Sequence, residues 1–213
     1  PIDKGCDLMI AIIDYGVGNL FSLYSSLKFI GAEAVITSSP EEIKKADKII
    51  LPGVGAFGDA ADKLRLSGLD KIIRCEADSG KDIMGICLGM QLLFEKSYEY
   101  GEHDGLGLLP GKVVPIEGYI PANLKIPHIG WNRLIFKQKN KLFRYISEGD
   151  CVYFVHSYYA ASCDKYVIAS AEYGKELTAA VAKENIMGCQ FHPEKSGEVG
   201  LNILRAFCDI KGS

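Results

Sequence analysis

Apolar residues in the first half of the chain fall into short continuous runs separated by segments with helical spacing. The runs are rich in Ile, Leu, Met and Ala, and they cover 9–14, 34–37, 48–51 and 83–86. Short continuous apolar runs are typical of strands buried on both faces, whereas apolar residues three and four positions apart predict amphipathic helices. Because strands and helices alternate, we expect a mostly parallel sheet with helices on both faces, the doubly wound α/β architecture.

Polar and turn residues mark where the helices of this half begin. The first predicted helix covers about 20–30 and is closed by Gly31. In the second predicted helix, Ser39 is the expected N-cap, Pro40 the first helical residue and Glu42 the acid of a capping box. The next two helices are expected to begin near Asp59 and near Leu69. These helices then serve as crossovers between parallel strands.

The second half of the chain, from residue 101 onward, has a different character, because most of its predicted elements are strands rather than helices. Its predicted strands cover 112–116, 132–136, 151–159, 167–173, 177–182 and 186–191, and an amphipathic helix follows from about 199 to 210. No linker and no change of composition divides the chain. We therefore expect one domain over residues 9–211, a flavodoxin-like mixed sheet of mostly parallel strands with a β-rich second half. Residues 1–8 are interpreted as an upstream extension.

The segment 82–95 has the pattern of a nucleophile elbow, in which a strand turns directly into a helix, here predicted from Leu88 to Glu95. Gly85 and Gly89 flank Cys87 two residues away on either side, as glycines do where a sharp turn leaves no room for a Cβ atom. The start of the helix favours a thiolate at Cys87, and the N–H of Leu88 would point toward a developing oxyanion. Taken alone, the motif is equally compatible with a small buried cysteine between packing glycines.

A second candidate for chemistry is the segment Gln190–Glu194, which follows the last predicted strand. Pro193 favours an extended backbone at His192, so the side chains of His192 and Glu194 are expected to point the same way. A carboxylate that orients an imidazole beside a thiol forms a Cys-His-Glu triad. In isolation the motif is more often a turn with solvated polar groups. At the end of a strand, in a chain with an elbow cysteine, the catalytic interpretation is favoured instead. The competing histidines without such a carboxylate are His103, His128 and His156.

The glycine-rich loop Pro52–Gly58 follows the third predicted strand. Its glycines allow the backbone to approach a ligand closely. In parallel α/β sheets, ligands bind beyond the carboxyl ends of the strands. Because Cys87 follows the fourth strand, we expect the loop and Cys87 to share one site.

Composition narrows the class of protein further. The 213 residues are 48% hydrophobic and 24% charged, and the net charge of −3 gives no electrostatic argument for nucleic acid or an anionic membrane as a partner. No apolar run approaches the length of about 20 residues that a membrane span needs. The seven cysteines are odd in number and contain no C-x-x-C, so neither disulfides nor a zinc site is indicated, and a cytoplasmic location with reduced thiols is expected.

These motifs together carry a resemblance to a known family. GICLGMQLLF with QFHPEKS about a hundred residues later resembles the class I, or triad, glutamine amidotransferases, and the likeness extends over the chain from Met9. Four further stretches resemble the glutaminase subunits of imidazole glycerol phosphate synthases: IDYGVGNL, LPGVGAFGDA, PHIGWN and YFVHSYY.

The resemblance implies hydrolysis of L-glutamine without a cofactor or metal. Cys87 would attack the side-chain amide, His192 would transfer the proton to ammonia, and Glu194 would orient His192. The implied oxyanion donors are the N–H groups of Leu88, Gly53 and Val54, and the implied glutamine-binding residues are Gln91, Ser157 and Tyr158. The simpler alternatives are an exposed helix residue for Gln91 and a strand packing residue for Tyr158.

The resemblance also implies a partner, a cyclase subunit of (βα)₈ barrel fold that forms a heterodimer with this chain and receives the ammonia. The residues that the resemblance assigns to this interface are Asn19, Trp131, Tyr153 and Lys195. The alternatives are core packing for Trp131 and a solvated charge for Lys195.

Three other functions remain open at this point. The partner could be an amidotransferase of surface-sugar biosynthesis, since the catalytic motifs would be the same. A hydrolase or chaperone-like α/β protein with an elbow cysteine is disfavoured by the His-Pro-Glu motif. A non-catalytic flavodoxin-like binding module would have no use for Cys87, His192 and Glu194 together.

Overall fold

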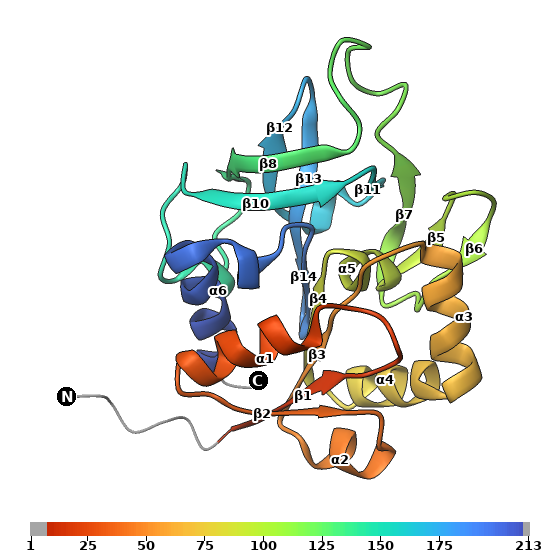
Figure 1. Ribbon diagram of the computed structural model, residues 1–213, viewed down its shortest axis with the longest axis vertical. Coiled ribbons are helices and arrows are strands. Elements are labelled where there is room, and N and C mark those ends of the chain that lie inside the picture. Colours follow the sequence, from red (N-terminus) through yellow and green to blue (C-terminus); the bar gives the residue numbers. More distant parts are fainter. Residues whose placement is uncertain (1–7, 211–213) are drawn as a thin grey trace.

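The structure is a computed structural model that describes residues 8–210, so most of the predicted extension at 1–8 lies outside the described residues (Figure 1). Within this range, eight strands form the main sheet in the order β2-β1-β3-β4-β14-β13-β12-β9. The parallel strands are β1 (Met9–Ile13), β2 (Glu33–Thr37), β3 (Lys48–Leu51), β4 (Asp82–Ile86) and β14 (Ile186–Cys189). The antiparallel strands are β13 (Glu176–Lys183), β12 (Val167–Glu172) and β9 (Ile135–Phe136). The mixed, mostly parallel sheet is therefore confirmed.

Helices cover both faces of the parallel part of this sheet. One face carries α1 (Leu20–Phe29) and α6 (Gly197–Asp209), whose apolar residues share a core with Ile10 and Ile12 of β1. The other face carries α2 (Pro40–Lys45), α3 (Phe57–Ser67), α4 (Leu69–Asp78) and α5 (Leu88–Leu92), which share a second core with Ala11 and Ile13. Successive residues of β1 thus face opposite cores, as the continuous apolar run predicts for a strand buried on both sides.

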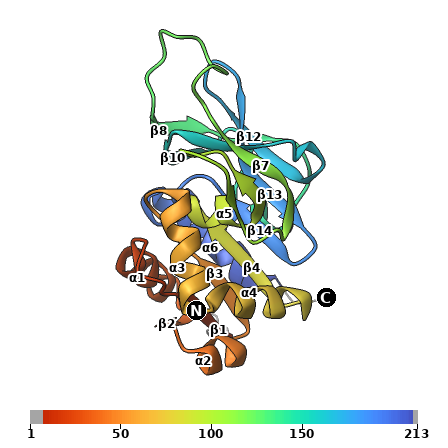
Figure 2. The same ribbon diagram turned by 90° about the vertical axis from the view of Figure 1, so that its right-hand side faces the viewer.

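The β-rich part lies at one end of the molecule, beyond the helix-covered sheet (Figure 2). One small sheet pairs β8 (His128–Arg133) with β10 (Cys151–His156). The other has the order β11-β7-β5-β6, formed by β11 (Tyr158–Ala161), β7 (Leu109–Pro115), β5 (Phe94–Ser97) and β6 (His103–Asp104). Two predicted strands are each broken in two, since 132–136 divides between β8 and β9, and 151–159 divides between β10 and β11 at Ser157.

The helix after the elbow is shorter than predicted. It ends at Leu92, and Glu95 lies in strand β5. The cause is a tertiary contact, because the backbone carbonyls of Leu92 and Leu93 accept hydrogen bonds from the N–H groups of Leu106 and Leu108 at 2.7 and 2.9 Å. These bonds take the place of those that would have continued the helix, which a helical spacing of apolar residues does not reveal.

The start of α2 matches the prediction in part. The hydroxyl of Ser39 accepts a hydrogen bond from the N–H of Glu42 at 3.5 Å, as an N-cap does. The carboxylate of Glu42 bonds to the Thr37 hydroxyl, and the N–H of Ser39 donates to that same hydroxyl at 2.9 Å. Thr37 therefore replaces the second half of the predicted capping box.

Candidate active site

Cys87 occupies the sharp turn between β4 and α5. Its φ of 55° and ψ of −113° lie in a region that residues with a Cβ rarely adopt. A Cβ on Gly85 would lie 2.6 Å from the carbonyl oxygen of Gly89, and one on Gly89 would lie 1.8 Å from the carbonyl oxygen of Leu51. Both glycines are thus required by close backbone approach, which is the geometry of a nucleophile elbow.

His192 and Glu194 are in direct contact. Nδ1 of His192 lies 2.8 Å from Oε1 of Glu194, and both side chains are almost completely buried. The backbone reason differs from the prediction, because Pro193–Lys195 forms a 3₁₀ turn and only His192 is extended. Two bonds close this turn, from the N–H of Lys195 to the carbonyl of His192 and from the N–H of Ser196 to the carbonyl of Pro193, both at 3.0 Å.

Ser196 holds this segment against β10 and was missed by the sequence analysis. Its hydroxyl donates to the carbonyl of His192 at 2.6 Å and accepts from the N–H of Tyr153 at 2.9 Å. The N–H of His192 also donates to the carbonyl of Tyr153 at 3.0 Å. A serine two residues after the His-Pro-Glu motif gives no sequence signal for this role.

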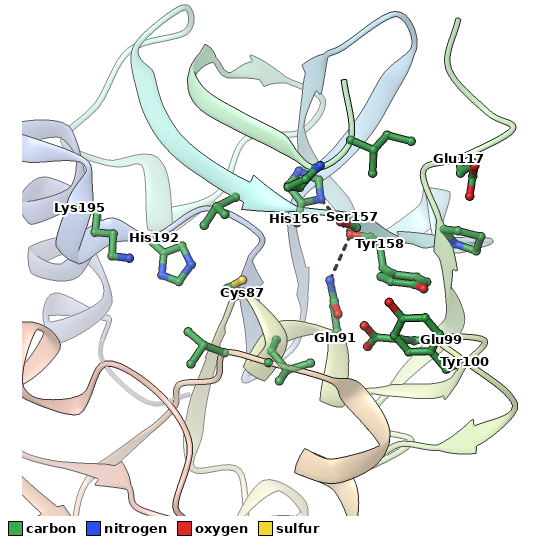
Figure 3. Close-up of a pocket in the computed structure, with 17 residues that line it drawn as sticks. Cys87, Gln91, Glu99, Tyr100, Glu117, His156, Ser157, Tyr158, His192 and Lys195 are labelled. Carbon is green, nitrogen blue, oxygen red and sulfur yellow. Dashed lines mark hydrogen bonds between the residues drawn. The ribbon is translucent and has the colours of Figure 1, made fainter. Parts of the chain in front are cut away.

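The imidazole of His192 lies beside the sulfur of Cys87 (Figure 3). Within residues 8–210, the buried Nε2 of His192 has no hydrogen-bond partner, so it is free to exchange a proton with this thiol. Burial lowers the pKa of His192, but the interactions with Cys87 and Glu194 outweigh it and raise the pKa to about 9. At neutral pH the imidazole is therefore mostly protonated and places a positive charge beside the sulfur of Cys87.

The loop after β3 packs directly on the elbow. A Cβ on Gly53 would lie 2.9 Å from the amide nitrogen of Gly89 and 3.0 Å from Cβ of Leu88. Val54 and Leu88, two of the three predicted oxyanion donors, line the same cavity as Cys87. The buried hydroxyl of Tyr15 donates to the carbonyl of Pro52 at 2.7 Å and fixes the start of the loop, a contact that the sequence analysis missed.

A cavity of about 560 Å³ opens beside Cys87 and His192. This volume is in the range of small-molecule sites. Its walls contain the three residues predicted to bind glutamine: Gln91, Ser157 and Tyr158. The side chain of Gln91 is buried and its Nε2 donates to the carbonyl of Tyr158 at 3.1 Å (Figure 3), so the alternative of an exposed helix residue is wrong.

Two carboxylates and a tyrosine that were not predicted also line the cavity: Glu99, Glu117 and Tyr100. Glu99 is buried and accepts a hydrogen bond from the N–H of Phe57, at the start of α3, at 2.6 Å. Burial raises the pKa of Glu99, and the bond from Phe57 opposes this in part. Glu99 belongs to no motif, and it lies two residues beyond β5, which pairs with β7.

Two of the histidines set aside in the sequence analysis form a buried pair next to the cavity. Nδ1 of His128 lies 3.1 Å from Nε2 of His156, and Nδ1 of His156 donates to the carbonyl of Tyr158 at 2.8 Å. Burial lowers the pKa of His128 to about 4 and that of His156 to about 3. Both rings are therefore neutral at physiological pH and act as hydrogen-bonding groups.

Of the four residues assigned to an interface, Lys195 and Asn19 adjoin the site, while Trp131 and Tyr153 contact each other. Trp131 is 58% exposed and its ring lies edge-on to that of Tyr153 with centroids 6.1 Å apart, so the alternative of core packing is wrong for Trp131. Lys195 lines the cavity beside His192 (Figure 3). Asn19 adjoins a small void that Val54 and Glu194 also border.

Among residues 8–210, no three histidine, cysteine, aspartate or glutamate side chains come together in a way that could hold a metal ion. None of the helices in this part of the chain has the length and apolar character that crossing a bilayer requires.

Residues 11–210 match the family described as glutamine amidotransferase class-I. The chain is 52% identical over 202 residues to the imidazole glycerol phosphate synthase subunit HisH of Bacillus velezensis, covering 93% of this chain and 95% of the relative. It is 50% identical over 203 residues to the protein of the same name from Caldanaerobacter subterraneus, covering 95% and 98%.

Solved structures resemble the fold at lower identity. One described as a glutamine amidotransferase has a TM-score of 0.72 at 19% identity and covers 92% of this chain and 98% of its own. One described as PurLQS from Thermotoga maritima has a TM-score of 0.72 at 22% identity and covers 94% and 97%. With the family match and the relatives near 50% identity, these findings show that the chain belongs to the class-I glutamine amidotransferases and, within them, to the imidazole glycerol phosphate synthase HisH subunits.

Proposed function

We propose that this chain is a glutaminase that hydrolyses L-glutamine to L-glutamate and ammonia and supplies the ammonia to a cyclase subunit in histidine biosynthesis. The observation that carries the proposal is the hydrogen bond of His192 to Glu194, with the imidazole beside Cys87 at the wall of the 560 Å³ cavity (Figure 3). The names of the relatives near 50% identity favour this pathway over surface-sugar biosynthesis.

In the proposed reaction, the thiolate of Cys87 attacks the carbonyl carbon of the glutamine side-chain amide, and the C=O electron pair moves to the oxygen. The N–H groups of Leu88 and of the Gly53–Val54 turn stabilise this oxyanion, and each such donor contributes about 10² to 10³ in rate. The intermediate collapses when the C–N bond breaks and His192 gives its proton to the leaving nitrogen, which departs as ammonia.

The remaining thioester is hydrolysed at the same site. Neutral His192 takes a proton from a water molecule, whose oxygen attacks the thioester carbonyl. The C–S bond then breaks, glutamate leaves, and Cys87 returns as a thiolate beside the imidazolium. Glu194 keeps Nδ1 of His192 protonated throughout, so that Nε2 is the atom that exchanges the proton.

We propose that the far end of the cavity binds the amino-acid head group of glutamine. The carboxylate of Glu99 suits the α-ammonium group, because it is buried and makes a single hydrogen bond to Phe57. Gln91, Ser157 and Tyr158 complete this end of the cavity. Paired charges inside a partly dry pocket discriminate glutamine from simple amides.

The proposed partner is a (βα)₈ barrel cyclase that docks as a heterodimer over the mouth of the site. Exposed apolar and aromatic side chains that could contact it include Trp131 and Ile129 of β8 and Val54 at the cavity, which are 58%, 58% and 42% exposed. Such side chains are enriched in the cores of protein interfaces. Asn19, Tyr153 and Lys195 are proposed as further contacts, and residues 9–211 as the single domain that makes them.

The test is glutamate release from L-glutamine by the chain alone, by its mixture with the cyclase subunit, and by that mixture with the cyclase substrate. We expect glutamate in the complex and a 1:1 complex by light scattering. The absence of glutamate under all three conditions would disprove the glutaminase. Glutamate release without complex formation would leave the glutaminase in place and reject the partner.

A further inference from the structure

We propose that Gln190 is a further catalytic residue, which donates a side-chain N–H to the sulfur of Cys87 and holds the nucleophile as a thiolate. The inference rests on the proposed function, since it assigns a group to the same nucleophile. Nε2 of Gln190 lies 3.7 Å from Sγ of Cys87, within hydrogen-bond range for a sulfur acceptor. An N–H that donates to a thiolate stabilises the charged form.

The backbone of Gln190 is fixed at the end of β14, next to the elbow. Its own N–H donates to the carbonyl of Ala179 at 2.8 Å, and the carbonyl of the preceding Cys189 accepts the N–H of Cys87 at 2.8 Å. The side chain of Gln190 is fully buried and forms no part of the cavity wall. Gln190 therefore approaches the sulfur from the protein interior and leaves the cavity side free for substrate.

Which end of the Gln190 amide faces the sulfur is determined by its neighbours. Oε1 of Gln190 accepts a hydrogen bond from Nε2 of Gln91 at 2.9 Å, so Nε2 of Gln190 is the atom left for Cys87. Gln91 is in turn oriented by the carbonyl of Tyr158, which can only accept and which receives Nε2 of Gln91 at 3.1 Å. The same carbonyl also receives Nδ1 of His156 at 2.8 Å.

This chain of hydrogen bonds carries no net charge. Both amides are uncharged, and burial keeps His156 neutral by lowering its pKa to about 3. A neutral, pre-oriented donor stabilises a charge on sulfur without introducing a second charge that must be compensated. It also links Gln91, at the cavity wall, to the nucleophile through a single intervening side chain.

The titratable groups around Cys87 come from three segments: Tyr15 after β1, Cys189 in β14, and His192 with Glu194 in the segment that follows β14. His192 is the ionisable partner of the sulfur, and Gln190 is a non-ionisable one. Removing the Gln190 donor should therefore change how strongly the thiolate is favoured without removing the proton-transfer group.

The test is the pH dependence of Cys87 alkylation by iodoacetamide, followed by peptide-level mass spectrometry that separates Cys87 from the other cysteines. Alkylation needs neither glutamine nor a partner, so the result does not depend on whether the glutaminase proposal succeeds. The variant is Gln190→Met, which keeps an unbranched side chain of similar length and leaves Gln91 bonded to Tyr158. The matched control is Gln138→Met. Gln138 lies on the surface, and its side-chain amide donates hydrogen bonds to the carbonyls of Lys165 and Val167.

We expect the alkylation midpoint to rise by about one pH unit in Gln190→Met, the size of a charge-assisted hydrogen bond, and to stay unchanged in Gln138→Met. A thiolate that has lost a donor is also more nucleophilic, so the rate at the high-pH plateau should rise about threefold while the rate at low pH falls. This crossing of the two profiles is a result that a merely structural role of Gln190 would not give.

An unshifted midpoint in a folded Gln190→Met protein would overturn the proposal, as would a rate lowered equally at every pH. Should Gln190→Met fail to fold, Gln190→Glu retains the shape and the acceptor for Gln91 but presents a carboxylate to the sulfur. The midpoint should then rise further than in Gln190→Met, and an unshifted or lowered midpoint would again contradict the proposed donor.

Discussion

Nδ1 of His192 lies 2.8 Å from Oε1 of Glu194, and the exposed fractions of the two side chains are 2% and 3%. Because both groups are shielded from water, their interaction is screened little by salt. The orientation of the imidazole, and with it the proton transfer to and from Cys87, depends on this one carboxylate.

The raised pKa of His192 predicts a pH-dependent contribution to stability. The pKa is about 9 in the folded protein and the ordinary value is 6.5, so the contribution is fully present below pH 6.5 and is lost as the pH rises through 9. We expect the free energy of unfolding of the unmodified chain to fall between pH 6.5 and 9.5 by about 1 to 3 kcal/mol more than that of His192→Asn. Urea unfolding at several pH values measures this, and parallel profiles for the two proteins would contradict it.

Replacing Cys87 by alanine should abolish glutamine-dependent activity, because it removes the thiol that lies beside the imidazole of His192 (Figure 3). A partner cyclase supplied with an ammonium salt should continue to work, since its chemistry needs only free ammonia. Measuring both reactions on the same Cys87→Ala complex separates loss of the nucleophile from loss of the complex. Glutamate release by this variant would rule out the assignment of Cys87.

The backbone conformation of Cys87 also lowers the free energy of unfolding, because a φ of 55° is strained for a residue with a Cβ. Cys87→Gly removes the strain, whereas Cys87→Ala retains it. Relief of such strain contributes about 1 to 3 kcal/mol, and the greater conformational entropy that glycine loses on folding offsets part of it. We therefore expect the glycine variant to be more stable than the alanine variant by about 1 kcal/mol. Equal midpoints of thermal unfolding for the two variants would show that the turn is unstrained.

The loop around Val54 predicts a partner-dependent rate. Gly55 has a φ of 101°, a conformation open to glycine, and Val54 is 42% exposed at the mouth of the site, so a docked partner can contact the loop. We expect kcat in the complex to be higher by about 10² or more, because the docked partner would hold an N–H group of the Gly53–Val54 turn toward the oxyanion. KM should change little, since the oxyanion forms only after attack. Equal kcat with and without partner would reject this switch, and a change in KM alone would indicate ordering of the glutamine site.

Glu99→Gln tests the proposed ammonium site. The substitution keeps an oxygen that can accept the N–H of Phe57 but removes the charge that would face the substrate. We expect KM for glutamine to rise about 10-fold or more, in line with the loss of a charge-assisted hydrogen bond, while kcat changes less. Glu102→Gln is the matched control, because Glu102 lies on the same loop as Glu99 but is exposed and forms an ion pair with Lys96 of β5. A KM unchanged by Glu99→Gln would exclude Glu99 from substrate binding.

The sequence by itself was sufficient for the elements and motifs that depend on neighbouring residues. The alternation of apolar runs with helical stripes predicted the parallel strands and the helices on both faces, because burial on two sides leaves a local pattern in each strand. The glycines around Cys87 predicted the elbow for a similar reason, since a sharp turn excludes a Cβ two residues away. His192 and Glu194 could be paired because they are two residues apart.

Only the tertiary structure decided which distant groups meet. The pairing of β14 with β4, in which Cys189 lies opposite Ile86, brings Gln190 and His192 beside Cys87. Other long-range contacts end α5 at Leu92 and place Glu99 in the wall of the cavity. The local pattern of these segments gave no sign of the hydrogen bond from Gln190 or of the position of Glu99, because the packing of the whole sheet decides which strands pair.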